Sequence, residues 1–115
     1  MGYRMNIVDT QNPAISYYGT KLYAYCDMSE LKSYKYLDEI GIIDKLVTGE
    51  ESDGYFDKED AQMLWVCGYE NRFTLTAEQF REFIKLYQED LQCTIDDDRI
   101  KQLIESNSDK ELYWD

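Results

Sequence analysis

The chain has 115 residues, a length that fits one domain and is too short for two that each bury their own core. Apolar residues make up 43% and aromatic residues 15%, which is enough to offset the entropy of ordering the backbone, so a folded chain is expected. The formal net charge of −12, with no histidine, repels phosphate backbones and anionic membrane surfaces, and so argues against direct binding to nucleic acid or membranes.

Cysteine usage and hydropathy indicate a protein of the cytoplasm. Cys26, Cys67 and Cys93 are widely spaced and form no C-x-x-C pair, so neither a disulfide framework nor a zinc site is expected. No apolar run approaches the roughly 20 residues of a membrane-spanning helix, and no signal segment opens the chain. We therefore expect three reduced, mostly buried thiols.

Two strands are predicted near the start of the chain. Residues 3–8 alternate between apolar and polar side chains, which is typical of a half-buried strand, and residues 9–14 end it in a loop. A second alternation runs over residues 21–26, and Gly19 before it indicates a turn or a bulge.

A helix is predicted over residues 30–40. Ser29 is its expected N-cap and Gly41 its left-handed stop, with an apolar stripe formed by Leu31, Tyr34, Leu37 and Ile40. Residues 42–47 form either a short second helix or a buried connection. Periodicity does not choose between the two.

Residues 48–60 are rich in Gly, Ser and carboxylates and are predicted to be a loop. Residues 61–66 are either a short helix or a strand. The β-favouring side chains that end this segment favour a strand that pairs with residues 72–75 through a turn over 68–71.

The clearest predicted element is a helix over residues 77–92. Thr76 and Gln79 match a capping box, while Leu75 and Phe80 match a hydrophobic staple. One apolar stripe at helical spacing follows, made of Phe80, Phe83, Ile84, Tyr87 and Leu91.

A last helix and a last strand are predicted to complete an α+β domain over residues 1–115. Asp96 is the expected N-cap of the helix, with Ile95 and Ile100 as a second staple. Residues 110–114 read as an edge strand with Leu112 and Trp114 on one face. The expected fold is an antiparallel sheet of three to four strands packed against two or three helices.

Metal binding is the first chemistry that so acidic a chain has to be tested for. Placing Gly54 at the turn glycine of a calcium loop puts Gly49 at the first ligand position and Asp60 at the last, where a bidentate Glu is needed. Residues 96–98 are explained by their place at a helix N-terminus. We therefore expect no metal ligands.

The sequence shows no pattern typical of catalysis or of cofactor binding either. The absence of histidine removes the commonest general base and the commonest activator of a thiol, and the cysteines lie in or beside apolar runs. The glycines stand singly, so no phosphate-binding loop is present. We expect no catalytic residue and no cofactor.

The remaining expectation is a non-enzymatic protein-binding role, as an adaptor or inhibitor whose partner is another protein with a basic surface. Tyrosine is abundant, and six of the 11 tyrosines lie within residues 17–36. Such a cluster fits either the margin of a core or a binding surface. Tyr23, Tyr25 and Trp65 are the predicted anchors.

Two alternatives stay open beside it. In the first, an acidic face imitates a phosphate backbone and inhibits a host protein that handles DNA or RNA, as in inhibitors of phage or mobile-element type, with Glu50, Glu51 and Asp53 as the contacts. In the second, the chain is a small enzyme with a site that lacks histidine. The charge is equally consistent with simple solubility, and the oligomeric state is left open.

Overall fold

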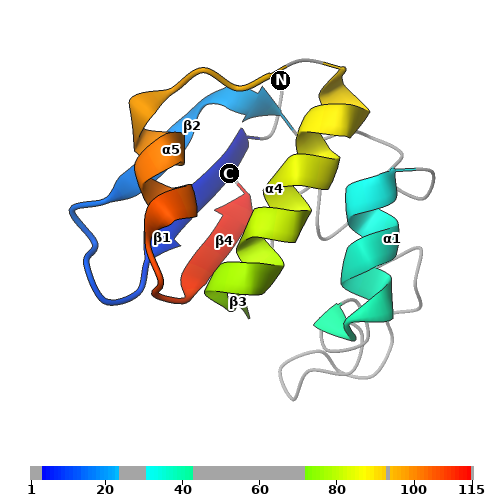
Figure 1. Ribbon diagram of the computed structural model, residues 1–115, viewed down its shortest axis with the longest axis horizontal. Coiled ribbons are helices and arrows are strands. Elements are labelled where there is room, and N and C mark those ends of the chain that lie inside the picture. The colour runs from blue at the N-terminus through cyan, green and yellow to red at the C-terminus, as the bar shows by residue number, and fades with distance from the viewer. Residues whose placement is uncertain (1–3, 24–30, 43–71, 93, 115) are drawn as a thin grey trace.

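The computed structural model describes residues 4–23, 31–42, 72–92 and 94–114. These residues form a four-stranded antiparallel sheet and three helices, which confirms the expected α+β class. Helices α4 and α5 cover one face of the sheet, and α1 lies beside α4 on the side away from α5 (Figure 1).

The sheet joins both ends of the described chain with one short strand from its middle. Its strands are β1 (Arg4–Asp9), β2 (Ser16–Tyr23), β3 (Phe73–Leu75) and β4 (Lys110–Trp114), in the order β2-β1-β4-β3. Strand β4 therefore lies in the interior of the sheet, and the prediction of an edge strand there was wrong. The reason is that β3 pairs with the side of β4 that β1 leaves open, from Phe73 opposite Leu112 to Leu75 opposite Lys110.

Strand β2 begins earlier than the sequence predicts, at Ser16. Asn6 pairs with Tyr18 and Arg4 with Tyr23, so the register between β1 and β2 shifts over the part of β2 that contains Gly19. This irregularity lies where Gly19 predicted a turn or a bulge, and it explains why the alternation over residues 21–26 missed the start of the strand. Residues 61–66, the predicted partner of residues 72–75, lie outside the described residues.

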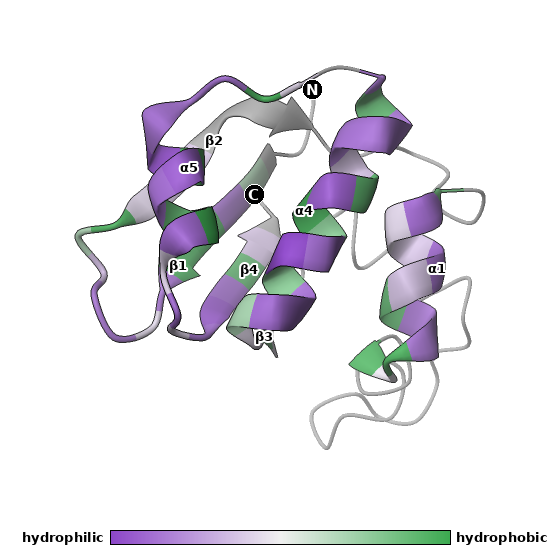
Figure 2. Cartoon of the chain, viewed as in Figure 1, coloured by the Kyte–Doolittle hydropathy of each residue, from purple (hydrophilic) through white to green (hydrophobic). Residues whose placement is uncertain are grey.

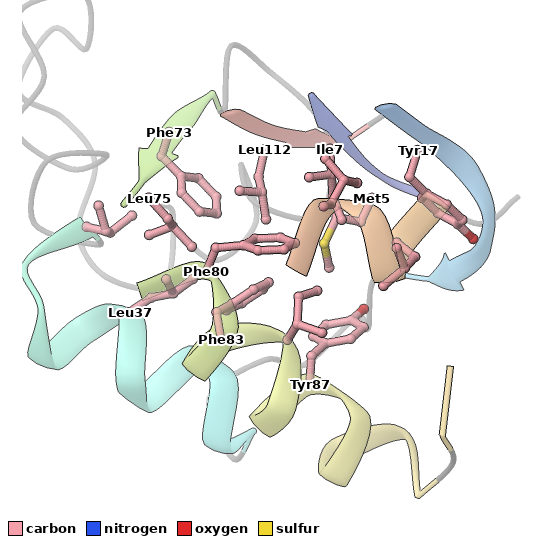
Figure 3. Packing of buried hydrophobic residues seen from close by; sticks show 14 of the residues in the cluster. Met5, Ile7, Tyr17, Leu37, Phe73, Leu75, Phe80, Phe83, Tyr87 and Leu112 are labelled. Atoms are coloured by element: carbon pink, nitrogen blue, oxygen red, sulfur yellow. The ribbon is translucent and has the colours of Figure 1, made fainter. Parts of the chain in front are cut away.

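The core lies between the sheet and the helices. Antiparallel register puts four buried side chains in one row across the sheet, in the order Tyr17, Ile7, Leu112 and Phe73. They face the buried side chains of α4 (Figure 3), and α5 adds further apolar residues to the same cluster, namely Ile100 and Leu103. Apolar bands interrupt the polar surface of α4 (Figure 2), as expected for a helix with one buried face.

Helix α4 (Ala77–Leu91) has the predicted start. The hydroxyl of Thr76 accepts a hydrogen bond from the Gln79 N–H at 3.2 Å, and the Gln79 side chain accepts one from the Thr76 N–H at 3.0 Å, which confirms the capping box. The helix ends at Gln92, which has a left-handed φ of 55°.

Helix α5 (Asp98–Glu105) begins one residue later than predicted. Its N-cap is Asp97, whose carboxylate accepts from the Arg99 N–H at 2.9 Å, and not Asp96. The Arg99 guanidinium also binds the Asp97 carboxylate, whereas Asp96 pairs with Lys101 at 2.8 Å. The hydrogen bond from the Arg99 N–H identifies Asp97 as the cap.

Helix α1 (Lys32–Glu39) is shorter than the predicted helix over residues 30–40. Its N-cap is Leu31, which has no capping side chain, and Ser29 lies outside the described residues. Gly41 follows the helix with φ of +83°, which confirms the left-handed stop. Ile42 is buried, and the rest of residues 42–47 lies outside the described residues.

Replacing Phe83 or Ile84 with Ala is expected to lower the free energy of unfolding by about 2–5 kcal/mol, because each side chain is buried in the core and leaves a cavity when truncated. Urea denaturation measures the loss. Lys85→Ala, at an exposed position of the same helix, is the control and should change stability by less than about 0.5 kcal/mol. Equal losses at the three positions would contradict the assigned core.

Candidate functional site

The predicted anchors fall where the structure gives no side-chain geometry. Tyr25 and Trp65 lie outside the described residues, and Tyr23 is known only as the last residue of β2. The predicted acidic contacts lie outside as well: Glu50, Glu51 and Asp53. All six assignments therefore stay predictions.

The tyrosine cluster divides between core and surface. Tyr17 and Tyr34 are buried in the core, and Tyr36 is half-buried and packs against it. Tyr18 is 56% exposed. Most of the described tyrosines of this cluster therefore contribute to the core margin, and Tyr18 contributes to the surface.

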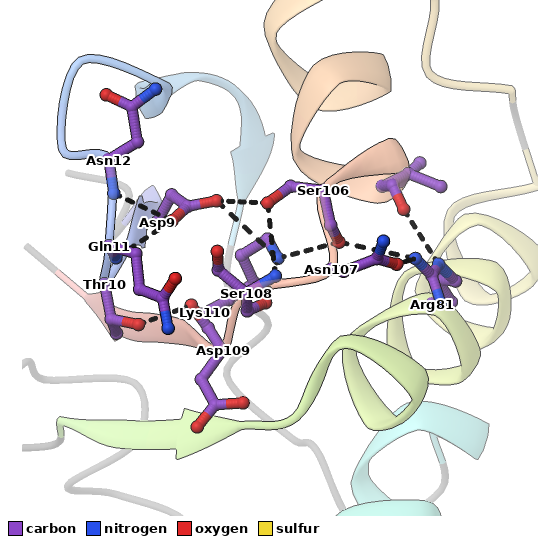
Figure 4. A network of polar contacts seen from close by, with 11 residues as sticks. Asp9, Thr10, Gln11, Asn12, Arg81, Ser106, Asn107, Ser108, Asp109 and Lys110 are labelled. Atoms are coloured by element: carbon purple, nitrogen blue, oxygen red, sulfur yellow. Dashed lines mark hydrogen bonds and ion pairs between the residues drawn. The ribbon is translucent and has the colours of Figure 1, made fainter.

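The densest group of polar side chains lies where β1 ends and β4 begins (Figure 4). The Lys110 ammonium and the Asp9 carboxylate are 3.8 Å apart, and both side chains are almost completely buried. Sequence reasoning missed this pair because Asp9 was assigned to a loop and residue 110 to an edge strand. One signal in the sequence could have found it. Lys110 lies two residues before Leu112, and because strand residues two apart face the same side, an inward-facing Leu112 predicts an inward-facing lysine.

The Asp9 carboxylate closes the turn that follows β1. One of its oxygens accepts hydrogen bonds from the N–H groups of Gln11 and Asn12, each at 3.0 Å, as aspartates at turns often do. The other accepts from the Ser106 hydroxyl at 2.5 Å. One side chain therefore joins the first hairpin to the segment after α5.

Two cations hold the turn between α5 and β4. The Lys110 ammonium donates to the carbonyl oxygens of Ser106, at 3.2 Å, and of Ser108. From α4, the Arg81 guanidinium donates to the Ile104 carbonyl at 2.8 Å and to the Asn107 side chain at 3.0 Å. These carbonyls lie at the C-terminal end of α5, where the helix dipole favours positive charge.

The charge states of this group indicate a structural role. Burial alone would raise the pKa of Asp9, but the hydrogen bonds from Ser106, Gln11 and Asn12 and the charge of Lys110 together lower it. Burial lowers the pKa of Lys110, and Asp9 only partly opposes this. A lowered pKa is what a carboxylate that accepts several hydrogen bonds shows, so it agrees with the role of Asp9 in closing the turn after β1.

The face of the sheet away from the helices carries a second group, here called the outer sheet face: Asn6, Tyr18, Arg72, Glu111 and Tyr113. The register places Asn6 between Tyr18 and Tyr113. The Arg72 guanidinium lies 4.5 Å from the centre of the Tyr113 ring and 3.1 Å from the Glu111 carboxylate.

Exposure differs strongly within the outer sheet face. The side chain of Arg72 is 64% exposed, comparable with Tyr18, whereas Asn6 is only 2% exposed. The side-chain amide nitrogen of Asn6 is buried without a hydrogen-bond partner. An exposed tyrosine and an exposed arginine on one surface are the residue types that most often dominate protein–protein binding.

The acidity of the chain is unevenly distributed along it. Residues 43–71 hold eight acidic and two basic side chains, which is half of the net charge, whereas the described residues hold 13 acidic and 10 basic ones. Several described carboxylates are paired with cations, as in Glu89 with Lys32 and Glu111 with Arg72. Residues 43–71 therefore carry the largest share of the net negative charge.

Searches of the described residues and comparisons with known proteins add three findings. Within the described ranges, no group of three or more metal-ligating side chains is assembled. No helix among them has the length and apolar character needed to cross a membrane. Comparison with protein-family models, curated proteins and solved structures found no match.

Replacing Lys110 with Ala is expected to cost about 3–5 kcal/mol of stability, because it leaves the Asp9 carboxylate buried without its cation. The double variant Asp9→Asn/Lys110→Ala should lose less stability than the sum of the losses in Asp9→Asn and Lys110→Ala, as a double-mutant cycle in urea would show. Lys101→Ala, at an exposed position, is the control. Strict additivity would contradict direct coupling.

Acid should lower the free energy of unfolding by protonating Asp9. Because its pKa is lower in the folded chain than the ordinary value of 3.8, its contribution to stability is complete above that value and is lost as the pH falls through the folded pKa. Urea denaturation between about pH 2 and 5 should show that the free energy of unfolding depends less steeply on pH in Asp9→Asn than in the wild type. An unchanged slope would contradict the lowered pKa.

Proposed function

We propose that the chain is a non-enzymatic protein-binding domain, an adaptor or inhibitor, that acts in the cytoplasm on another protein. The observation that carries the proposal is the outer sheet face, where Tyr18 is 56% exposed on β2 and Tyr113 and Arg72 lie on the same face beyond β1. A planar aromatic ring and a guanidinium give a partner large contact areas with little rotamer entropy to lose.

The polar clusters of the described residues support a role without catalysis. Ser106 and Lys110 come nearest to a serine–lysine arrangement, but the hydroxyl donates to Asp9 and the ammonium donates to backbone carbonyls. Both are engaged in holding the turn before β4. The alternative of a small enzyme without histidine therefore draws no support from this pair.

The mimic of a phosphate backbone is the second candidate, and one observation favours it. Half of the net charge is carried by residues 43–71, which include Glu50, Glu51 and Asp53. A concentrated negative segment would suit a basic nucleic-acid channel in a host protein, as expected for an inhibitor of bacterial or phage origin. The two candidates use different surfaces and are separable by experiment.

Photo-crosslinking in lysate of the native host tests the proposed surface. A photoreactive phenylalanine analogue at position 18 should capture a partner, because Tyr18 is 56% exposed on the proposed face. The same analogue at Gln102, an exposed position on α5 on the other side of the sheet, is the matched control. Equal capture from both positions, or capture from Gln102 alone, would refute the assignment of the outer sheet face.

Affinity for the captured partner then separates the candidates. Tyr18→Ala and Arg72→Ala should each weaken binding about tenfold or more while the fold is kept. Combined neutralisation of Glu50, Glu51 and Asp53 should have a small effect, and binding should persist at high salt. A steep salt dependence with no effect at Tyr18 would favour the mimic.

The anchors predicted from the sequence alone are tested in the same assay. Replacing Tyr23 and Tyr25 with Ala should abolish binding if these tyrosines, with Trp65, form the contact. Unchanged affinity in this double variant would remove them from the proposed interface.

A further inference from the structure

We propose that α1 is a separable element, which leaves and rejoins α4 while the sheet, α4 and α5 stay folded. With eight residues, α1 is too short to be stable in isolation, because isolated helices below about 12–15 residues are marginal in water. Its persistence therefore depends on what it packs against. Among the described elements, α4 makes the substantial contact with α1.

The start of α1 is held by a residue of another helix. Leu31 provides no capping side chain, and the Asp90 carboxylate near the end of α4 takes over that role. It accepts from the N–H groups of Lys32 at 2.9 Å and Ser33 at 3.0 Å, and from the Ser33 hydroxyl at 2.6 Å. A negative charge at this end also complements the dipole of α1.

The capping contact exists only while α1 is docked. When an N-cap lies within its own helix, the cap and the helix form together, but here they form only when two helices meet. Ser33 and its hydroxyl hydrogen bond are buried, and an undocked α1 would expose them to water. This also makes the formation of α1 depend on its docking against α4. Docking and helix formation are thus one event.

The apolar contribution of α1 is small compared with that of the rest of the core. The helix buries Tyr34 and Leu37, and Figure 3 places Leu37 next to Phe80 and Phe83 of α4. Most other members of the cluster lie on the strands, α4 and α5. Loss of α1 therefore uncovers one side of α4 and leaves its sheet-facing side, which includes Tyr87, in place.

The residues of α4 that α1 covers lie on one side of that helix. Asp90 identifies one side of α4 as the side that faces α1, and Leu86, four residues earlier, lies on the same side. Opening of α1 would uncover this side of α4. The Asp90 carboxylate holds the start of α1 in place there, and the Lys32–Glu89 ion pair lies beside it.

Native-state hydrogen exchange tests the proposal. In the wild type, the amides of residues 36–40 in α1 should exchange through an opening that leaves Ile7 and Leu112 protected. Asp90→Asn should accelerate exchange in α1 about tenfold or more, because hydrogen bonds to a charged group are replaced by weaker ones, and should not accelerate it at Ile7 or Leu112.

Two further variants sharpen this test. Ser33→Ala removes only the hydroxyl hydrogen bond to Asp90. It should accelerate hydrogen exchange in α1 and not in the sheet, by a smaller factor than Asp90→Asn does. Glu78→Gln removes an exposed carboxylate from the first turn of α4 and should change neither region. The proposal would be overturned if the amides of α1 and of the sheet were equally protected in the wild type. It would also be overturned if Asp90→Asn accelerated exchange in both, or unfolded the whole chain.

Discussion

The pairing of β1 with β4 is the constraint on which the described structure depends. It brings together strands about 100 residues apart in sequence, and it buries Asp9 and Lys110 at one end of the pair. A buried ion pair of this kind contributes little net stability but strongly penalises any arrangement that separates the charges. The Asp9–Lys110 pair therefore specifies register, since a slip of one residue in β4 would turn the ammonium to the other face.

Sequence reasoning succeeded where the deciding interactions are local. The capping box of α4 joins Thr76 and Gln79, which are three residues apart, and the stop after α1 requires only that Gly41 adopt a left-handed backbone. The period-two pattern of β1 was likewise visible, because the inward-facing Met5 and Ile7 alternate with polar neighbours. Each of these signals lies within one element.

The errors came from interactions between distant segments. The interior position of β4 depends on β1 and β3, and the buried state of Lys110 depends on Asp9. The start of α1 could not be located from neighbouring residues, because its cap is Asp90, far along the chain. The proposed binding face has the same origin: Tyr18, Tyr113 and Arg72 share one face only after the sheet has formed, so their grouping leaves no mark in the sequence.

The interior position of β4 has a consequence for synthesis of the protein. A ribosome makes β1 and β2 first and β4 more than 85 residues later, so the hairpin of β1 and β2 waits in solution with one edge unpaired. The Asp9–Lys110 ion pair is incomplete over the same period, because Asp9 is translated long before Lys110. Completion of the sheet therefore waits for the synthesis of β4, and the high sequence separation of its central contacts favours slow folding.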